Sequence, residues 1–236
     1  KLQTFPQPDR DLATDVIVLG GGITGALVAE AFTRRGVGTV VVDRRPIAHG
    51  STSASTALLQ YDVDEPLYSL QKEIGKQEAI TVYSLCAESI GYIENLVESM
   101  EDDCDFRKGP SLYFSTKRRD PLSLKKEYAA RKAAGFDVAY LEGDEIEARY
   151  QFSARRAIRS ALGAQIDPYR FTYALLQTVQ KRGGIVFEST PITRLETAGK
   201  VVMTTAGGCT ITARKIFFAL GYEAKDFLQE KTANLI

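Results

Sequence analysis

The run DVIVLGGGITGALVAEAFTRRGVGTVVVDRR (residues 15–45) decides the fold. DVIVLG (15–20) and TVVVD (39–43) are short β-rich runs, and the apolar residues between them recur at helical spacing until Gly36 and Gly38 stop the helix. A crossover this short joins two parallel strands. The run therefore predicts a β-α-β unit and an α/β fold with a parallel sheet.

The glycines of this unit form a phosphate-binding pattern. Gly20, Gly22 and Gly25 fit G-x-G-x-x-G directly after a strand and at the start of a helix. Gly20 allows a sharp turn, Gly22 allows the backbone to approach a pyrophosphate, and Gly25 allows close packing of helix and strand. Ile23 and Thr24 begin the helix, whose free N–H groups and positive dipole end attract phosphate. The alternative is that the glycines serve only a tight turn.

An acid closes the second strand of the unit. Asp43 stands where a carboxylate can accept hydrogen bonds from the hydroxyls of an adenosine ribose, and it would repel a 2′-phosphate. The sequence therefore indicates an unphosphorylated dinucleotide rather than NADP. Arg44 is a further candidate cofactor-binding residue, although Arg44 and Arg45 can equally be solvated surface charges.

Composition excludes several classes of function. The 236 residues include thirty basic and thirty acidic side chains, and this balance disfavours nucleic acid as a partner. The longest apolar runs are strand-length, which predicts no membrane span, and the polar N-terminus has no secretory signal. Three scattered cysteines predict a reduced, cytoplasmic protein. The single histidine, His49, excludes a multi-histidine metal site, so we expect no metal and expect a bound cofactor to carry any difficult step.

The rest of the chain alternates helical and strand patterns. The predicted helices cover residues 69–100, 122–134, 144–150 and 169–181, the last of them capped by Asp167 and Pro168. The predicted strands cover residues 104–106, 111–115, 138–141, 164–166, 185–188, 191–196, 200–205, 210–213 and 215–220.

Three later segments carry a resemblance to a known family. They are GSTSASTALL (50–59), GAQIDPYRFTYAL (163–175) and KIFFALGY (215–222). In order and spacing with the glycine motif, they resemble the D-amino acid oxidase-like group of FAD-dependent oxidoreductases, which includes glycine oxidase and sarcosine oxidase. The resemblance extends from residue 15 to about residue 222 and identifies FAD as the expected dinucleotide.

The resemblance implies further cofactor-binding residues. Ser51, Thr52 and Ser53 would lie near the pyrophosphate and the flavin, although a flexible Ser/Thr loop is the alternative reading. Ile192 falls where the family holds adenine with a backbone amide and carbonyl. Ala219 and Gly221 match the family's Ala-Thr-Gly, with Leu220 in place of the threonine.

The resemblance also bears on how FAD is attached. Some relatives carry a histidine that bonds covalently to the flavin, and Ala54 occupies the matching position here. His49 precedes this motif and is expected to be a loop residue. We therefore expect FAD to be held without a covalent bond.

The resemblance implies a Rossmann-like FAD-binding domain, with a parallel sheet and a β-meander, and an inserted α+β substrate subdomain. The expected division is residues 1–75 and 151–236 for the two parts of the FAD-binding domain, and 76–150 for the substrate subdomain. Members of the family continue well beyond this length with a second cofactor-binding segment. Because the chain stops at the apolar stretch FLQEKTANLI (227–236), we expect a truncated form that lacks the C-terminal part.

The implied activity is oxidation of the C–N bond of an amino acid or secondary amine by hydride transfer to the flavin. No residue can be named as catalytic, because Tyr113 and Arg170 fit ordinary structural positions better. Two other functions remain open at this point. An NAD-dependent dehydrogenase would have further β-α-β units directly after Asp43, and a non-catalytic nucleotide-binding or assembly module would keep the fold for contact with a partner.

Overall fold

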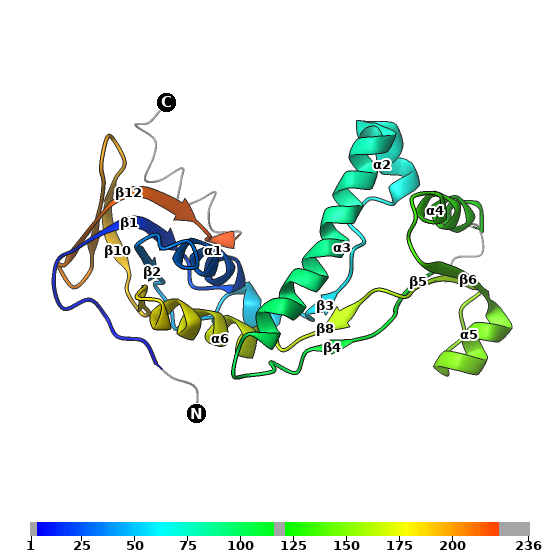
Figure 1. The fold of residues 1–236 in the computed structure, drawn as a ribbon, viewed down its shortest axis with the longest axis horizontal. Helices are drawn as coiled ribbons and strands as arrows, with labels where there is room; N and C mark the ends of the chain where they lie inside the picture. Colours follow the sequence, from blue (N-terminus) through cyan, green and yellow to red (C-terminus); the bar gives the residue numbers. More distant parts are fainter. Residues whose placement is uncertain (1–3, 116–120, 222–236) are drawn as a thin grey trace. The chain divides into compact units, whose positions relative to one another are not determined.

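The computed structural model describes residues 4–115 and 121–221 (Figure 1), which divide between two compact units. The first unit comprises the described residues of Lys1–Thr56, Met100–Cys104 and Asp167–Ile236, and the second those of Ala57–Ser99 and Asp105–Ile166. The predicted boundaries after residues 75 and 150 both lie inside the second unit. The assignment of a substrate-binding role to that unit stays a prediction.

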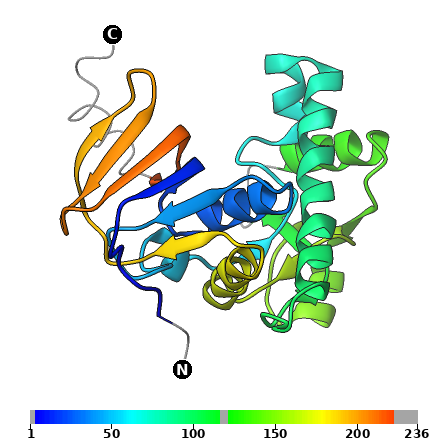
Figure 2. The same cartoon turned by 60° about the vertical axis from the view of Figure 1, so that its left-hand side comes forward.

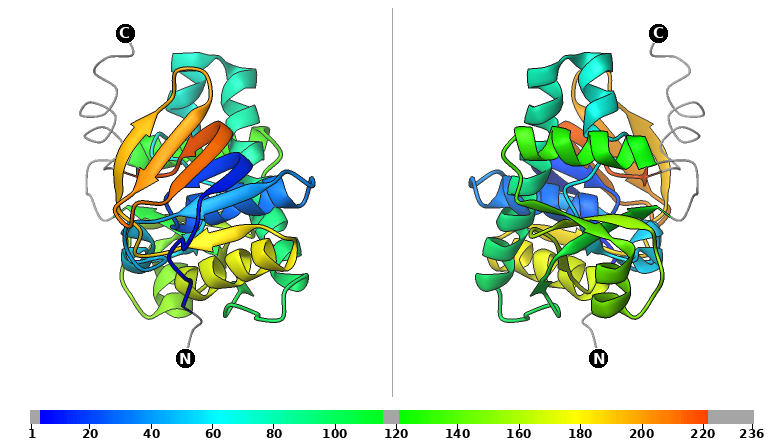
Figure 3. Two further views of the ribbon diagram at one scale, coloured as in Figure 1. Left: turned by 90° about the vertical axis from the view of Figure 1, so that its left-hand side faces the viewer. Right: turned by 90° about the vertical axis from the view of Figure 1, so that its right-hand side faces the viewer.

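A six-stranded sheet forms the first unit. Its order is β10-β11-β12-β1-β2-β9, and Figure 3 (left) shows these strands side by side. The four strands β12 (Thr210–Phe218), β1 (Leu12–Leu19), β2 (Thr39–Val42) and β9 (Ile185–Phe187) run parallel. The strands β10 (Ile192–Glu196) and β11 (Val201–Thr205) add an antiparallel meander to β12. The predicted α/β fold with a parallel sheet and a β-meander is confirmed.

Two helices cover this sheet. The helices α1 (Ile23–Thr33) and α6 (Pro168–Lys181) pack against each other, and Figure 2 shows them beside β2 and β9. The side chain of Asp167 caps α6 by accepting hydrogen bonds from the N–H groups of Tyr169 and Arg170, at 2.9 and 3.0 Å. This cap and the following proline confirm the predicted helix start. The strands beneath are buried on both faces, as an apolar run such as Val40–Val42 requires.

The end of the sheet differs from the sequence prediction. Residues 210–213 and 215–220, predicted as separate strands, belong to the single strand β12, which ends at Phe218. The reason is pairing, because β1 runs parallel to β12 from Leu12 opposite Ile211 to Leu19 opposite Phe218. Pairing with the long strand β1 thus keeps β12 continuous through the charged residues Arg214 and Lys215.

The second unit contains four helices and two small antiparallel sheets. The helices are α2 (Leu67–Ile74), α3 (Lys76–Glu98), α4 (Pro121–Ala133) and α5 (Gly143–Tyr150). One sheet has the order β3-β8-β4, from strands Leu58–Leu59, Ala164–Gln165 and Arg107–Lys108. The other has the order β5-β7-β6, from strands Ser111–Ser115, Arg156–Ser160 and Val138–Glu142.

Two predictions for this part of the chain are wrong. The helix predicted over 69–100 is broken into α2 and α3 at Gly75, whose φ of 101° lies outside the helical region. The strand predicted over 104–106 is a turn, because Cys104 and Asp105 both adopt the left-handed conformation with φ of 50° and 49°. In both places backbone conformation overrides an apolar pattern.

A buried cationic centre holds the second unit together. Arg131 on α4 is 1% exposed, forms an ion pair with Asp62 and donates to Glu127 Oε1 at 2.6 Å. Its guanidinium also lies over the rings of Tyr61, Tyr83 and Tyr113. Burial alone would lower the pKa of Arg131, but the two carboxylates more than offset this effect and the pKa is raised. One side chain therefore joins α3, α4, β5 and the segment after β3.

Neither a membrane-spanning helix nor a metal-binding group of side chains occurs in the part of the chain that the structure describes. No helix there combines the length and the apolar composition needed to cross a membrane. Among the same residues, no three or more His, Cys, Asp or Glu side chains are grouped so that they could hold a metal ion.

We predict that Arg131→Met lowers the free energy of unfolding by about 3–5 kcal/mol, because it leaves two carboxylates buried without a counter-charge. The measurement is urea unfolding at pH 7. The matched control is Arg149→Met, which removes an exposed ion pair with Glu145 on α5 and should cost less than about 1 kcal/mol. Equal costs for the two variants would contradict the structural role of Arg131.

The cluster also predicts a pH dependence. Burial raises the pKa of Asp62 above its usual 3.8, Arg131 lowers it and Glu127 raises it again, and the net direction is upward. Folding thus favours the protonated carboxyl group of Asp62. Its contribution to the free energy of unfolding is complete below pH 3.8 and is lost as the pH rises through the raised pKa. We expect wild type to lose stability relative to Asp62→Asn as the pH rises from 3.5 to 7. The slope should correspond to the titration of about one group. A difference that stays constant over this range, measured by urea unfolding, would contradict the shift.

Candidate nucleotide-binding site

A cavity of about 820 Å³ opens in the first unit where the parallel strands end. Ligands of open α/β sheets bind at the carboxyl ends of the strands, where β1 and β2 finish here. The lining residues are Leu19, Gly20, Gly22, Ile23, Thr24, Val42, Asp43, Arg44, Arg45, Gly50, Ser51, Thr52, Ser55, Thr190, Pro191, Ile192, Ala219, Leu220 and Gly221. Every predicted cofactor-binding residue except Gly25 and Ser53 is among them.

The glycine turn is built by close backbone approach. Gly20 has a φ of 114°, and a Cβ there would overlap the carbonyl of Ala219 after β12. A Cβ at Gly25 would overlap the carbonyl oxygen of Gly20. Gly25 therefore allows α1 to begin directly against the turn without itself facing the cavity, which is the packing task predicted for it.

The N-terminus of α1 faces the cavity with little capping of its own. Gly22 is the N-cap residue, no acidic side chain lies in the first turn, and the N–H of Ile23 donates to Thr52 Oγ1 at 3.0 Å. Thr52 is buried in the short 3-10 helix η1 (Ser51–Ala54). The hydroxyl oxygen of Thr52 accepts this bond, so the O–H of the same group can rotate to donate to an anion. The positive end of the helix and this hydroxyl make a suitable phosphate site.

Asp43 has two tasks at the end of β2. Its Oδ2 accepts from the N–H of Gly21 at 2.6 Å, and its Oδ1 accepts from the N–H of Arg45 at 2.8 Å. Each carboxylate oxygen can accept a second hydrogen bond, so the side chain is both fixed in position and able to receive ribose hydroxyls. The acid thus links the glycine turn to the second strand.

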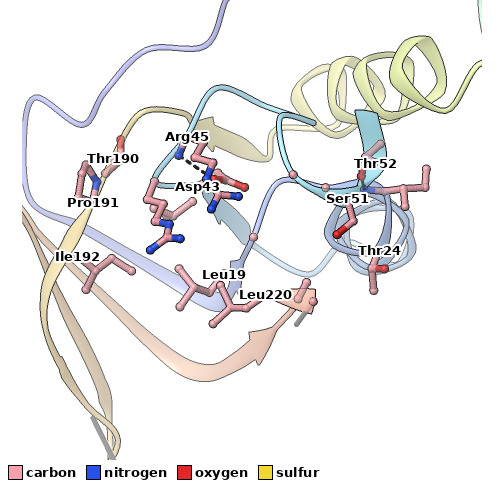
Figure 4. A pocket seen from close by; sticks show the side chains of 18 of the residues that line it. Leu19, Thr24, Asp43, Arg45, Ser51, Thr52, Thr190, Pro191, Ile192 and Leu220 are labelled. Atoms are coloured by element: carbon pink, nitrogen blue, oxygen red, sulfur yellow. Dashed lines mark hydrogen bonds between the residues drawn. The ribbon is translucent and has the colours of Figure 1, made fainter. Parts of the chain in front are cut away.

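The lining residues follow an order along the cavity (Figure 4). Thr190, Pro191 and Ile192 lie at one end, Asp43 and Arg45 lie in the middle, and Ser51, Thr52 and Thr24 lie at the other end. This order fits a dinucleotide laid along the sheet edge with adenine at Ile192, ribose at Asp43 and pyrophosphate at α1. The assignment of these residues to adenine, ribose and pyrophosphate stays a prediction.

Some lining residues were not predicted, and two predicted residues, Gly25 and Ser53, lie outside the lining. Thr190 and Pro191 precede β10, and the N–H of Thr190 donates to the Asp43 carbonyl at 2.8 Å, a contact across the sequence that no local signal reveals. Arg45, considered a possible surface charge, lines the cavity together with Arg44. Ser53 donates its hydroxyl to the Gly50 carbonyl at 2.9 Å and lies outside the lining.

A glycine-rich turn at a helix N-terminus, an acid on the next strand and a cavity at the strand ends define a dinucleotide-binding protein. Comparison with known families makes this specific. The FAD dependent oxidoreductase (DAO) family matches residues 15–235, and the chain belongs to this family, whose cofactor is FAD.

Individual relatives are distant and longer. The putative Rieske 2Fe-2S iron-sulfur protein YhfW of Bacillus subtilis is 24% identical over 189 residues, 80% of this chain and 36% of that protein. Gamma-glutamylputrescine oxidoreductase of Escherichia coli is 22% identical over 225 residues, 93% of this chain and 51% of that protein. The crystal structure of glycine oxidase from Bacillus cereus superposes with a TM-score of 0.71 at 20% identity, covering 92% of this chain and 58% of that one. The chain thus spans about half or less of the curated relatives' length.

The residues present fit FAD held without a covalent bond. Ala54, at the position of the covalent histidine in some relatives, has no group that could attack a flavin. His49 is exposed, and its Nδ1 donates to the carbonyl of Ile47 at 2.9 Å. The predicted truncation rests on residues 227–236, which lie outside the described residues.

We predict that Gly22→Val abolishes FAD binding, with a loss of at least about a hundredfold in affinity. A Cβ at Gly22 already lies 3.1 Å from Thr52 Oγ1, so a branched side chain displaces this hydroxyl and fills the pyrophosphate position. The measurement is titration of the apoprotein with FAD by flavin fluorescence. The control is Gly91→Val in α3, where a Cβ meets no atom within 4 Å. Unchanged flavin uptake by Gly22→Val would refute the site.

Proposed function

We propose that the chain is the FAD-binding portion of an oxidoreductase that oxidises the C–N bond of an amino acid or secondary amine. The observation that carries this proposal is that the residues predicted to bind adenine, ribose and pyrophosphate follow one another along one cavity, in a chain that belongs to an FAD-dependent oxidoreductase family. The substrate class is supported by the amine and amino-acid enzymes among its structural and sequence neighbours, which include glycine oxidase and gamma-glutamylputrescine oxidoreductase.

The chain's own residues bind and orient the cofactor. The N–H groups at the start of α1, with Ser51 and Thr52, donate hydrogen bonds to the pyrophosphate, while Asp43 accepts hydrogen bonds from the ribose hydroxyls. The backbone at Ile192 holds adenine, and Leu19, Leu220 and Ile192 add apolar side chains to the cavity lining. Ala219 and Gly221 close the cavity where β12 ends. Arg44 and Arg45 add positive charge to the cavity lining.

FAD, when bound, supplies the acceptor for a hydride from the substrate carbon next to nitrogen, and water hydrolyses the resulting imine. This chemistry depends on alignment more than on an acid–base pair. That requirement agrees with a chain whose single histidine, His49, is an exposed loop residue that is hydrogen-bonded to the carbonyl of Ile47. The described residues are therefore assigned to holding the cofactor, and no catalytic residue is named among them.

We expect the purified protein to carry or take up a flavin, and we expect its visible band to bleach anaerobically with an amine. The panel is glycine, sarcosine, D- and L-amino acids and a polyamine derivative, with glycerol 3-phosphate as a substrate oxidised at a C–O bond. The Gly22→Val protein serves as the control for flavin-independent signals.

The outcomes separate the competing functions. Bleaching by glycerol 3-phosphate and by no amine would leave the FAD assignment intact and overturn the C–N proposal. A colourless protein that refuses FAD but binds a protein partner would favour a non-catalytic assembly module. The NAD-dependent alternative predicted further β-α-β units directly after Asp43, whereas the chain enters η1 and then β3.

A further inference from the structure

Glu188 is a buried acid that the cofactor assignment does not use. It follows β9, is 7% exposed, and its Oε2 accepts a hydrogen bond from the N–H of Ile47 at 3.1 Å. Burying a carboxylate is costly unless hydrogen bonds compensate for its lost hydration. A carboxylate buried at this cost, two residues before the lining residue Thr190, calls for a specific task.

The surroundings of Glu188 indicate that task. The segment after β9 pairs with the segment after β2, through the N–H of Asp43 to Phe187 O at 3.0 Å and the N–H of Thr190 to Asp43 O at 2.8 Å. The N–H of Ser189 donates to Arg45 O at 2.9 Å. The Glu188 carboxylate extends this pairing to Ile47, beyond the last backbone hydrogen bond. It thereby anchors the far end of the turn formed by residues 43–48.

This turn in turn holds the glycine loop. Asp43 accepts from the N–H of Gly21, and the N–H of Ala48 donates to the carbonyl of Gly21 at 3.2 Å. Between these two contacts the fully buried side chain of Ile47 lies so close to Gly21 that a Cβ there would overlap its Cδ1. The N–H and the carbonyl of Gly21 are thus both hydrogen-bonded, one to each end of the 43–48 turn.

We propose that Glu188 is a positioning residue for the nucleotide, which acts by fixing the 43–48 turn and so the orientation of the Asp43 carboxylate. The inference rests on the proposed binding of the adenosine ribose at Asp43. Its effect falls on the adenosine half of the cofactor, so ADP reports it as well as FAD does.

The test is a double-mutant cycle on ligand affinity. Dissociation constants for ADP and FAD are measured for wild type, Glu188→Ala, Glu188→Gln, Asp43→Asn and the double variant Asp43→Asn/Glu188→Ala. We expect Glu188→Ala to weaken both ligands by about tenfold, as loss of a buried charged hydrogen bond allows. Glu188→Gln retains an acceptor for the Ile47 N–H and should restore affinity to within about threefold of wild type. In the Asp43→Asn background, Glu188→Ala should cost less than about threefold, because the residue through which it acts is already impaired.

The matched control is Glu30→Ala. Glu30 is a fully buried acid of the same unit, paired with Arg182 at 2.6 Å and outside the cavity lining. Its loss should reduce thermal stability without changing ADP affinity, which separates positioning from general destabilisation.

Each remaining outcome decides the matter. Unchanged ADP affinity in Glu188→Ala, or a tenfold loss that persists in the Asp43→Asn background, would overturn the inference while wild-type FAD binding leaves the proposed function standing. A wild-type protein that binds neither ADP nor FAD would overturn the proposed function and the inference with it.

Discussion

The first unit depends on the contact between the Asp43 carboxylate and the backbone of Gly21. A glycine-rich turn has no side chains to fix it, so its conformation must be imposed from outside. Asp43, at the end of β2, accepts from the N–H of Gly21, and the N–H of Ala48 donates to the carbonyl of the same glycine. With the turn fixed, α1 begins against Gly20 and presents its N-terminus to the cavity. Asp43, the acid expected to bind the ribose, therefore also fixes the glycine turn of the same site.

Charge is stabilised by different means around the cavity and in the second unit. Around the cavity, Asp43 and Glu188 are met by backbone N–H groups, which supply hydrogen bonds without cancelling the charge. In the second unit, Arg131 is met by two carboxylates and the faces of three tyrosine rings. The first arrangement suits a site that must orient a ligand. The second joins elements distant in sequence, which suits a small unit built from short strands.

Much of the fold could be predicted because its signals are local. The β1-α1-β2 unit follows from apolar periodicity and three glycines, and α6 follows from a capping acid and a proline. The predictions that are wrong concern places where the backbone departs from the side-chain pattern. Apolar spacing continues through Gly75, although its positive φ separates α2 from α3. Residues 104–106 carry strand-like side chains on a left-handed turn.

The sequence by itself determined the nucleotide motif, the acid at the end of β2 and, through three further segments, the FAD-dependent family. These depend on residue type and spacing along a continuous stretch of chain. Only the tertiary structure decided what surrounds that motif. The Glu188 carboxylate accepts a hydrogen bond from the N–H of Ile47, 141 positions away in the sequence, and Thr190 meets Asp43 because β9 pairs with β2. Pairing between strands so far apart depends on the packing of the whole sheet, which spacing along the chain does not encode.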